Sequence, residues 1–174
     1  MSDSTRSKSK KTINVYLVIG EPNMGKSTAI RHLVAFTERG KALFEKELLT
    51  VYPSPFIISF YGYQALQESG ISPQDFIQFV KNQAKQPENL ILALRLNATN
   101  GNKNVGAFPD ANAYIQAFIK AGWTISKSVV LDDSGNAKYP KNWNALSVLS
   151  RPAQGKAVPT NRMAANTRIY FGWI

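Results

Sequence analysis

The sequence predicts a three-layer α/β fold, in which a mainly parallel sheet of about four or five strands has helices on both faces. Apolar runs of strand length alternate along the chain with helical segments of about a dozen residues, a pattern typical of parallel sheets with right-handed crossovers. Apolar residues make up 44% of the 174 residues, enough for one core. We therefore expect a single domain over 12–174, preceded by a disordered basic tail over 1–11.

The first half of the chain supplies three predicted strands and two predicted helices. Residues 13–19 form an almost continuous apolar run that ends at a glycine, as in a strand buried on both faces. Helical spacing follows up to Gly40, which is placed to end that helix. Residues 56–60 predict a second strand. A helix with an N-cap, a first-turn proline and an acidic capping residue begins at 72–75.

The second half continues the alternation. Residues 90–96 predict a third strand, and the Asn/Gly-rich stretch over 97–106 predicts a surface loop, with a lid or a partner-binding segment as the alternative. A helix is expected over 109–121 and a fourth strand over 125–131. Beyond these, 143–149 is read as a strand or a short helix, and 160–170 as a helix. The aromatic residues Tyr170, Phe171 and Trp173 cluster at its end, and we expect them to pack on the core, with docking of a partner as the alternative.

One segment carries a phosphate-binding pattern, GxxxxGK[ST], between the first strand and the first helix. Its glycines let the backbone curl so that N–H groups point at phosphate oxygens, and the helix adds its positive N-terminal end. Lys26 is expected to reach the β- and γ-phosphates, and Ser27 to place its hydroxyl on Mg²⁺. The predicted nucleotide-binding residues are Gly20, Glu21, Pro22, Asn23, Met24, Gly25, Lys26, Ser27 and Thr28.

In this segment the chain resembles the P-loop NTPase superfamily. The resemblance implies binding of a magnesium-bound nucleoside triphosphate and its hydrolysis or phosphoryl transfer. The spelling of the loop is also similar to that of the Era-like GTPases. However, the DxxG pattern at 132–135 comes far too late in the chain for that family, and 102–105 lacks the aspartate that would pair with guanine. We therefore favour ATP, with GTP as the less favoured alternative.

Hydrolases of this class need acidic residues near the metal and the attacking water. Asp132 and Asp133 follow the fourth predicted strand, so Asp132 is a candidate magnesium residue and Asp133 a candidate for orienting water. The sequence equally supports the interpretation that this pair belongs to a polar turn with no catalytic role. Asn97 and Asn100 are candidates for sensing phosphate. The arginines that could neutralise a transferring phosphoryl group are Arg151, Arg162 and Arg168.

Composition excludes several kinds of site and indicates a class of partner. The chain has no cysteine and one histidine, which excludes disulfides, thiolate nucleophiles and cysteine-bound zinc; His32 is expected to be structural. No apolar run approaches the ~20 residues needed to span a bilayer, and we expect a cytoplasmic protein. The net charge of +10, with basic segments at both ends, favours association with a polyanion, either nucleic acid or an anionic membrane.

Three functions remain open at this point. The leading one is an ATPase that drives a conformational or assembly step, acting with nucleic acid, in a homo-oligomer or in a larger assembly. The second is a small phosphotransferase acting on a nucleotide or metabolite. The third is a switch or structural subunit that binds nucleotide with little turnover.

Overall fold

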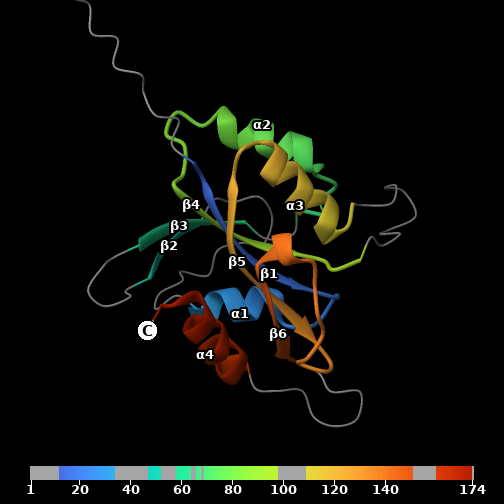
Figure 1. The fold of residues 1–174 in the computed structure, drawn as a ribbon. Coiled ribbons are helices and arrows are strands. Elements are labelled where there is room, and N and C mark those ends of the chain that lie inside the picture. The colour runs from blue at the N-terminus through green and yellow to red at the C-terminus, as the bar shows by residue number, and fades with distance from the viewer. Residues whose placement is uncertain are drawn as a thin grey trace, which may run out of the picture.

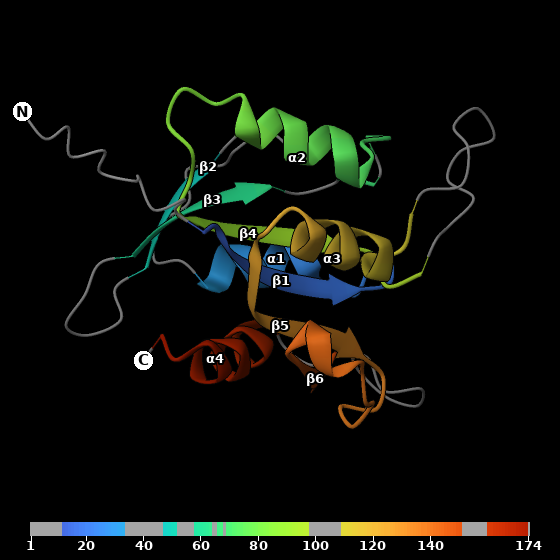
Figure 2. The ribbon, with the colours of Figure 1, turned by 45° about the horizontal axis from the view of Figure 1, so that its top comes forward.

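The chain folds around one mixed sheet, which is mostly parallel. The computed structural model describes residues 12–33, 47–51, 58–63, 66–67, 69–97, 109–150 and 160–173 (Figure 1). Its six strands lie in the order β2-β3-β4-β1-β5-β6, which can be followed from one edge to the other in Figure 2. Strands β3, β4, β1, β5 and β6 are parallel, and β2 pairs antiparallel with β3 at one edge. The predicted α/β class is confirmed.

The elements follow the predicted order with small shifts at their ends. The strands are β1 (Asn14–Gly20), β2 (Glu47–Val51), β3 (Ile58–Tyr63), β4 (Asn89–Leu94), β5 (Thr124–Asp132) and β6 (Ala145–Leu149). The helices are α1 (Lys26–Leu33), α2 (Pro73–Lys81), α3 (Ala111–Lys120) and α4 (Thr160–Phe171), with a 3-10 turn, η1 (Lys141–Trp143), before β6. Strand β2 is an addition to the prediction. The predicted tail over 1–11 and the helix end at Gly40 lie outside the described residues.

The described helices cover the two faces of the sheet in pairs. In Figure 1, α2 and α3 lie above the sheet, whereas α1 and α4 lie below it. Strand β1 contributes side chains to the core on each face of the sheet. Val15, Leu17 and Ile19 belong to the core between the sheet and helices α2 and α3. Val18 belongs to the core between the sheet and helices α1 and α4. A strand covered on both sides has no polar face, which explains its continuous apolar run.

Local sequence signals account for the starts of two helices. Ser72 caps α2, where its hydroxyl accepts the N–H of Asp75 at 3.1 Å and donates to the Asp75 carboxylate at 2.7 Å. Asp110 caps α3 by accepting the N–H of Ala113 at 2.8 Å. Both caps satisfy N–H groups that have no partner within the helix. The predicted start at 72–75 is confirmed.

A β-bulge explains the polar residues inside β5. The register with β1 pairs Val15 with Ile125 and Tyr16 with Lys127, so Ser126 is the extra residue of the bulge. Lys127 then faces α4, where its ammonium donates to Tyr170 O at 2.5 Å and lies 5.1 Å from the centre of the Tyr170 ring. The break in the apolar pattern is therefore compatible with a strand next to β1.

Helix α4 is held against α1 by its last residues. The Arg168 guanidinium donates to Leu33 O at 2.8 Å and to Trp173 O at 3.2 Å. Phe171 and Trp173 are buried and pack against Tyr16 of β1, with ring centres 5.3 Å from it in both cases. The prediction that the terminal aromatic residues pack on the core is confirmed. None of the helices within the described residues has the length and apolarity needed to cross a bilayer.

Candidate functional site

The segment with the phosphate-binding pattern lies at the centre of the carboxyl edge of the sheet. Strand β1, which precedes it, is flanked by β4 on one side and β5 on the other. Helix α1 begins at Lys26, directly after the turn, and its first helical hydrogen bond runs from Ala29 N to Gly25 O at 2.7 Å. Ligands of open parallel sheets bind at this edge, so the segment occupies the position where a phosphate site is expected.

The backbone between β1 and α1 is tightly curled. The N–H of Met24 donates to Glu21 O at 3.2 Å, and Asn23 and Gly25 both have positive φ angles, 64° and 85°. A Cβ atom at Gly20 would lie 3.0 Å from the main-chain oxygen of Leu131 on β5. Glycine is therefore favoured at Gly20 by the close approach of β5, and at Gly25 by its backbone angle.

Lys26 is folded back over this turn. Its side chain is buried, and its ammonium donates to Glu21 O at 2.9 Å. Ser27 is partly exposed and Thr28 is exposed, both in the first turn of α1. An ammonium group and the N–H groups at the start of a helix both favour a bound anion. The Lys26 ammonium and the start of α1 thus bring positive charge to the turn.

Contacts from both neighbouring strands fix the turn in place. On the β4 side, the Glu21 carboxylate oxygen Oε1 accepts hydrogen bonds from Asn97 Nδ2 at 2.6 Å and from Asn97 N at 3.2 Å. On the other side, the buried Ser150 hydroxyl donates to Met24 O at 2.8 Å, and Ser150 N donates to Asp132 O at 2.8 Å. The turn is therefore tied to residues that follow β4 and β6.

A buried glutamine holds the end of β4. The Gln67 side chain accepts the N–H of Arg95 at 2.7 Å and donates to Arg95 O and to Pro109 O, both at 3.1 Å. These bonds join the residues just after β4 to the residue before the cap of α3. Gln67 therefore positions the backbone next to Asn97, a role with no signal in the sequence pattern.

The Asp132 carboxylate is surrounded by hydrogen-bond donors of its own turn and of β6. Oδ1 accepts from Ser134 N at 2.8 Å, Ser134 Oγ at 3.0 Å and Gly135 N at 2.6 Å. Oδ2 accepts from Tyr139 Oη at 3.3 Å and also from Ser147 Oγ. Both oxygens are thus engaged within the protein, which favours the polar-turn interpretation of Asp132.

These hydrogen bonds set the ionisation of Asp132 and Tyr139. Burial alone raises the pKa of the Asp132 carboxyl, but the donors from Ser147, Gly135 and Ser134 outweigh burial and bring this pKa below its ordinary value of 3.8. The pKa of Tyr139 rises to about 12, because its hydroxyl is buried and lies beside the negative charge of Asp132. At neutral pH the pair is therefore a carboxylate bonded to a neutral phenol.

The other predicted site residues are spread over the molecule. Asp133 is exposed and has no hydrogen bond to the described residues. Arg168 is on α4 and contacts Leu33, which lies at the end of α1 away from the turn. Arg162 is also on α4 and is exposed. Asn100 and Arg151 fall outside the described residues, as does the side chain of His32.

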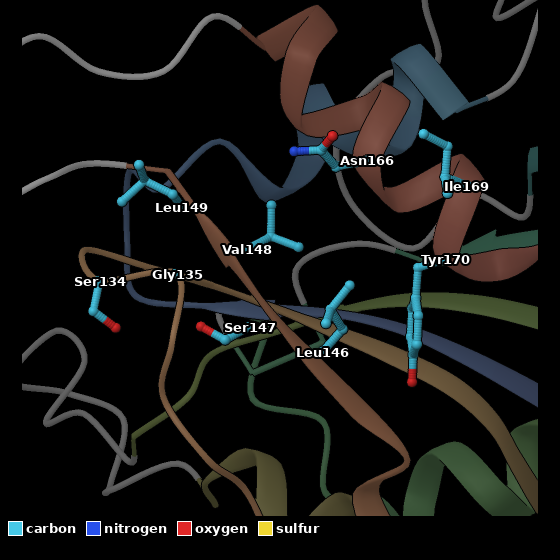
Figure 3. A pocket seen from close by; sticks show the side chains of 9 residues that line it. All are labelled: Ser134, Gly135, Leu146, Ser147, Val148, Leu149, Asn166, Ile169 and Tyr170. Carbon is cyan, nitrogen blue, oxygen red and sulfur yellow. The ribbon is translucent and has the colours of Figure 1, made fainter.

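A separate groove runs along the open side of β6. It has a volume of about 470 Å³ and lies between β6, the Ser134–Gly135 turn and α4, which contributes Asn166, Ile169 and Tyr170 (Figure 3). Its walls include the exposed side chains of Leu146, Leu149 and Ile169. The residues described above as contacting the 20–28 turn do not line this groove. Ser147 does line it, and its hydroxyl donates a hydrogen bond to Asp132.

Oxygen ligands at the turn suit Mg²⁺ only in part. No group of three histidine, cysteine, aspartate or glutamate side chains is placed to hold a metal ion in the described part of the chain. Mg²⁺ keeps several waters and is commonly held by one or two protein oxygens together with substrate phosphates. The Ser27 hydroxyl, in the first turn of α1, is an oxygen ligand of the kind that such a shared site uses, whereas the described residues do not form a site made of protein ligands alone.

Comparisons of the chain with protein families, curated proteins and solved structures found no match.

Proposed function

We propose that this chain binds a magnesium-bound nucleoside triphosphate at the 20–28 turn, with ATP as the favoured nucleotide, and hydrolyses it. The observation that carries the proposal is the curled backbone between β1 and α1, together with the buried Lys26 ammonium that lies over it. A turn of this kind offers backbone N–H groups and a charge to phosphate oxygens. The parallel sheet supports the proposal by its ligand-binding edge.

The residues of the turn have separate duties in this proposal. Backbone N–H groups around Gly25 and the first turn of α1 hold the phosphate oxygens. Lys26 exchanges its bond to Glu21 O for the β- and γ-phosphates, where its charge balances the negative charge that develops during transfer. Ser27 offers its hydroxyl to the metal. When bound, Mg²⁺ neutralises phosphate charge and orients the leaving group.

A switch that binds nucleotide with little turnover is the second candidate. The observation in its favour is that both oxygens of Asp132 are engaged by donors of the protein, so that this carboxylate is not free to hold a metal. Binding without release of phosphate is the outcome that separates a switch from a hydrolase.

Lys26→Ala is expected to weaken nucleotide binding by about 10- to 100-fold, because a charged hydrogen bond to phosphate contributes about 1.5–3 kcal/mol. The measurement is a calorimetric titration of wild type and variant with Mg-ATP and with Mg-GTP, with phosphate release followed in parallel. Lys120→Ala is the matched control, since Lys120 is exposed at the last turn of α3 and should leave the affinity unchanged. Equal affinities of wild type and Lys26→Ala would contradict the assignment of the site.

The charge of the chain supports a polyanionic partner as a further part of the proposal. Lys138 and Lys141 are exposed in the segment after β5, and the net charge is +10. We expect binding of a single-stranded oligonucleotide to weaken steeply between low and physiological salt, because the released counterions dominate such binding. Fluorescence anisotropy at several salt concentrations measures this. Affinity that does not change with salt would refute it.

A further inference from the structure

A hydrolase of the proposed kind needs a carboxylate near the metal and the attacking water. The described carboxylates at the carboxyl edge of the sheet are those of Glu21, Asp110, Asp132 and Asp133, together with Asp75 in the first turn of α2, whose Oδ2 accepts the Ser72 hydroxyl. Asp110 accepts the N–H of Ala113 as the cap of α3, and Asp132 is engaged at both oxygens. Asp133 is exposed and is held by none of the described residues. Glu21 is the remaining carboxylate, and it belongs to the turn itself.

The Glu21 side chain is fixed on the β4 side of the turn. Both donors of Asn97, its main-chain N and its side-chain Nδ2, bind the same oxygen, Oε1. The other oxygen, Oε2, accepts no hydrogen bond from the described part of the chain. Two donors on one oxygen hold the carboxylate in one orientation and leave the second oxygen available. A pre-positioned oxygen of this kind is what a metal ligand or a water-orienting group requires.

Three features place this carboxylate at the phosphate site. The main-chain oxygen of Glu21 is bonded to the ammonium of Lys26, at 2.9 Å. The residue follows Gly20, the last residue of β1. Its partner Asn97 lies just beyond β4, and β4 is a direct neighbour of β1. Strand β4 ends without an acid of its own, so Glu21 supplies negative charge at a place where the adjacent strand supplies none.

We propose that Glu21 is the carboxylate that holds the magnesium-bound nucleotide at this site, directly or through a metal-bound water, and that Asn97 is its positioning residue. The assignment rests on the proposed function. In this proposal Asp132 stabilises its own turn, and Glu21 interacts with the metal.

The charge of Glu21 gives the proposal a distinctive signature. Without a divalent cation, a carboxylate next to phosphates repels them and weakens binding. With Mg²⁺ present, the same carboxylate attracts the complex. Removal of the charge should therefore change affinity in opposite directions under the two conditions. A substitution that only damages the shape of the turn should weaken binding in both.

The experiment measures the affinity of the full chain for a fluorescent, non-hydrolysable ATP analogue in excess Mg²⁺ and in EDTA. For wild type we expect Mg²⁺ to tighten binding by about tenfold or more. For Glu21→Gln we expect binding in EDTA to be equal or tighter than that of wild type, and the effect of Mg²⁺ to fall below about twofold. Asn97→Ala leaves the turn sequence intact and should reduce the Mg²⁺ effect in the same direction. Asp133→Asn should retain the full effect.

The outcomes separate this inference from the proposed function. A wild-type chain that binds no nucleotide in either condition overturns the proposed function, and the Glu21 assignment with it. A wild type with a clear Mg²⁺ effect that Glu21→Gln and Asn97→Ala both retain overturns the Glu21 assignment alone. Loss of the effect in Asp133→Asn, with retention in Glu21→Gln, assigns the duty to Asp133 instead. Circular dichroism of each variant shows whether it is folded.

Discussion

Trp173→Ala is expected to lower the free energy of unfolding by about 3–5 kcal/mol, as large-to-small substitutions in cores do. Trp173 is only 2% exposed, and its ring packs against Tyr16 of β1 and against Phe171, with ring centres 5.3 Å and 4.8 Å away. Its main-chain oxygen also accepts a hydrogen bond from Arg168. The substitution leaves a cavity between α4 and the sheet. Urea unfolding followed by circular dichroism measures the change.

Ile169→Ala is the matched control for this prediction. Ile169 lies on the same helix, α4, but is 59% exposed, so its loss should change stability by less than about 0.5 kcal/mol. Equal effects of the two substitutions would mean that the packing of α4 on β1 contributes little to the fold. Helix α4 also approaches the proposed nucleotide site, because a Cβ atom at Gly25 would lie 3.3 Å from the Met163 methyl carbon. A loosened α4 should therefore weaken nucleotide binding as well.

Much of the fold follows from local patterns that the sequence displays directly. The apolar run before Gly20 and the caps at Ser72 and Asp110 each act within a few residues, so the strand and both helix starts could be predicted. Strand β2 was missed. It is five residues long and two of its apolar residues, Leu48 and Leu49, are adjacent, which gives no period-two alternation. Its pairing with β3 is a tertiary contact.

The candidate site could also be predicted only where its signals are local. The pattern of the 20–28 turn is contiguous, so its residue types could be recognised from sequence. The contacts that fix the turn join distant positions, such as Ser150 to Met24 and Asn97 to Glu21, 126 and 76 residues apart. No spacing rule predicts such contacts without the sheet order. The same holds for Asp132, where the pattern indicates an acid after a strand but not the donor from Ser147 that occupies it.

Asp132→Ala is expected to lower the free energy of unfolding by about 2–4 kcal/mol, because hydrogen bonds to a charged group contribute about 1.5–3 kcal/mol each and are not additive. The substitution removes the acceptor for Ser134, Gly135, Tyr139 and Ser147 together. Asp133→Ala is the control: the side chain is adjacent and carries the same charge, but it is exposed. It should change stability by less than about 0.5 kcal/mol. Equal effects at 132 and 133 would show that the hydrogen bonds of Asp132 contribute little.

Because the pKa of Asp132 is lowered in the folded state, the stability of the fold should depend on pH in a defined direction. A carboxyl with a lower pKa in the folded state than in the unfolded state stabilises the fold when it is ionised. This contribution is complete above the unfolded value of 3.8 and is lost as the pH falls through the lower pKa of the folded state. Asp132→Asn removes the titrating group, so the stability difference between wild type and variant should shrink over that acid range. Urea midpoints of both proteins between about pH 7 and pH 2.5 measure it. A difference that stays constant with pH would show that Asp132 titrates alike in the folded and unfolded chains.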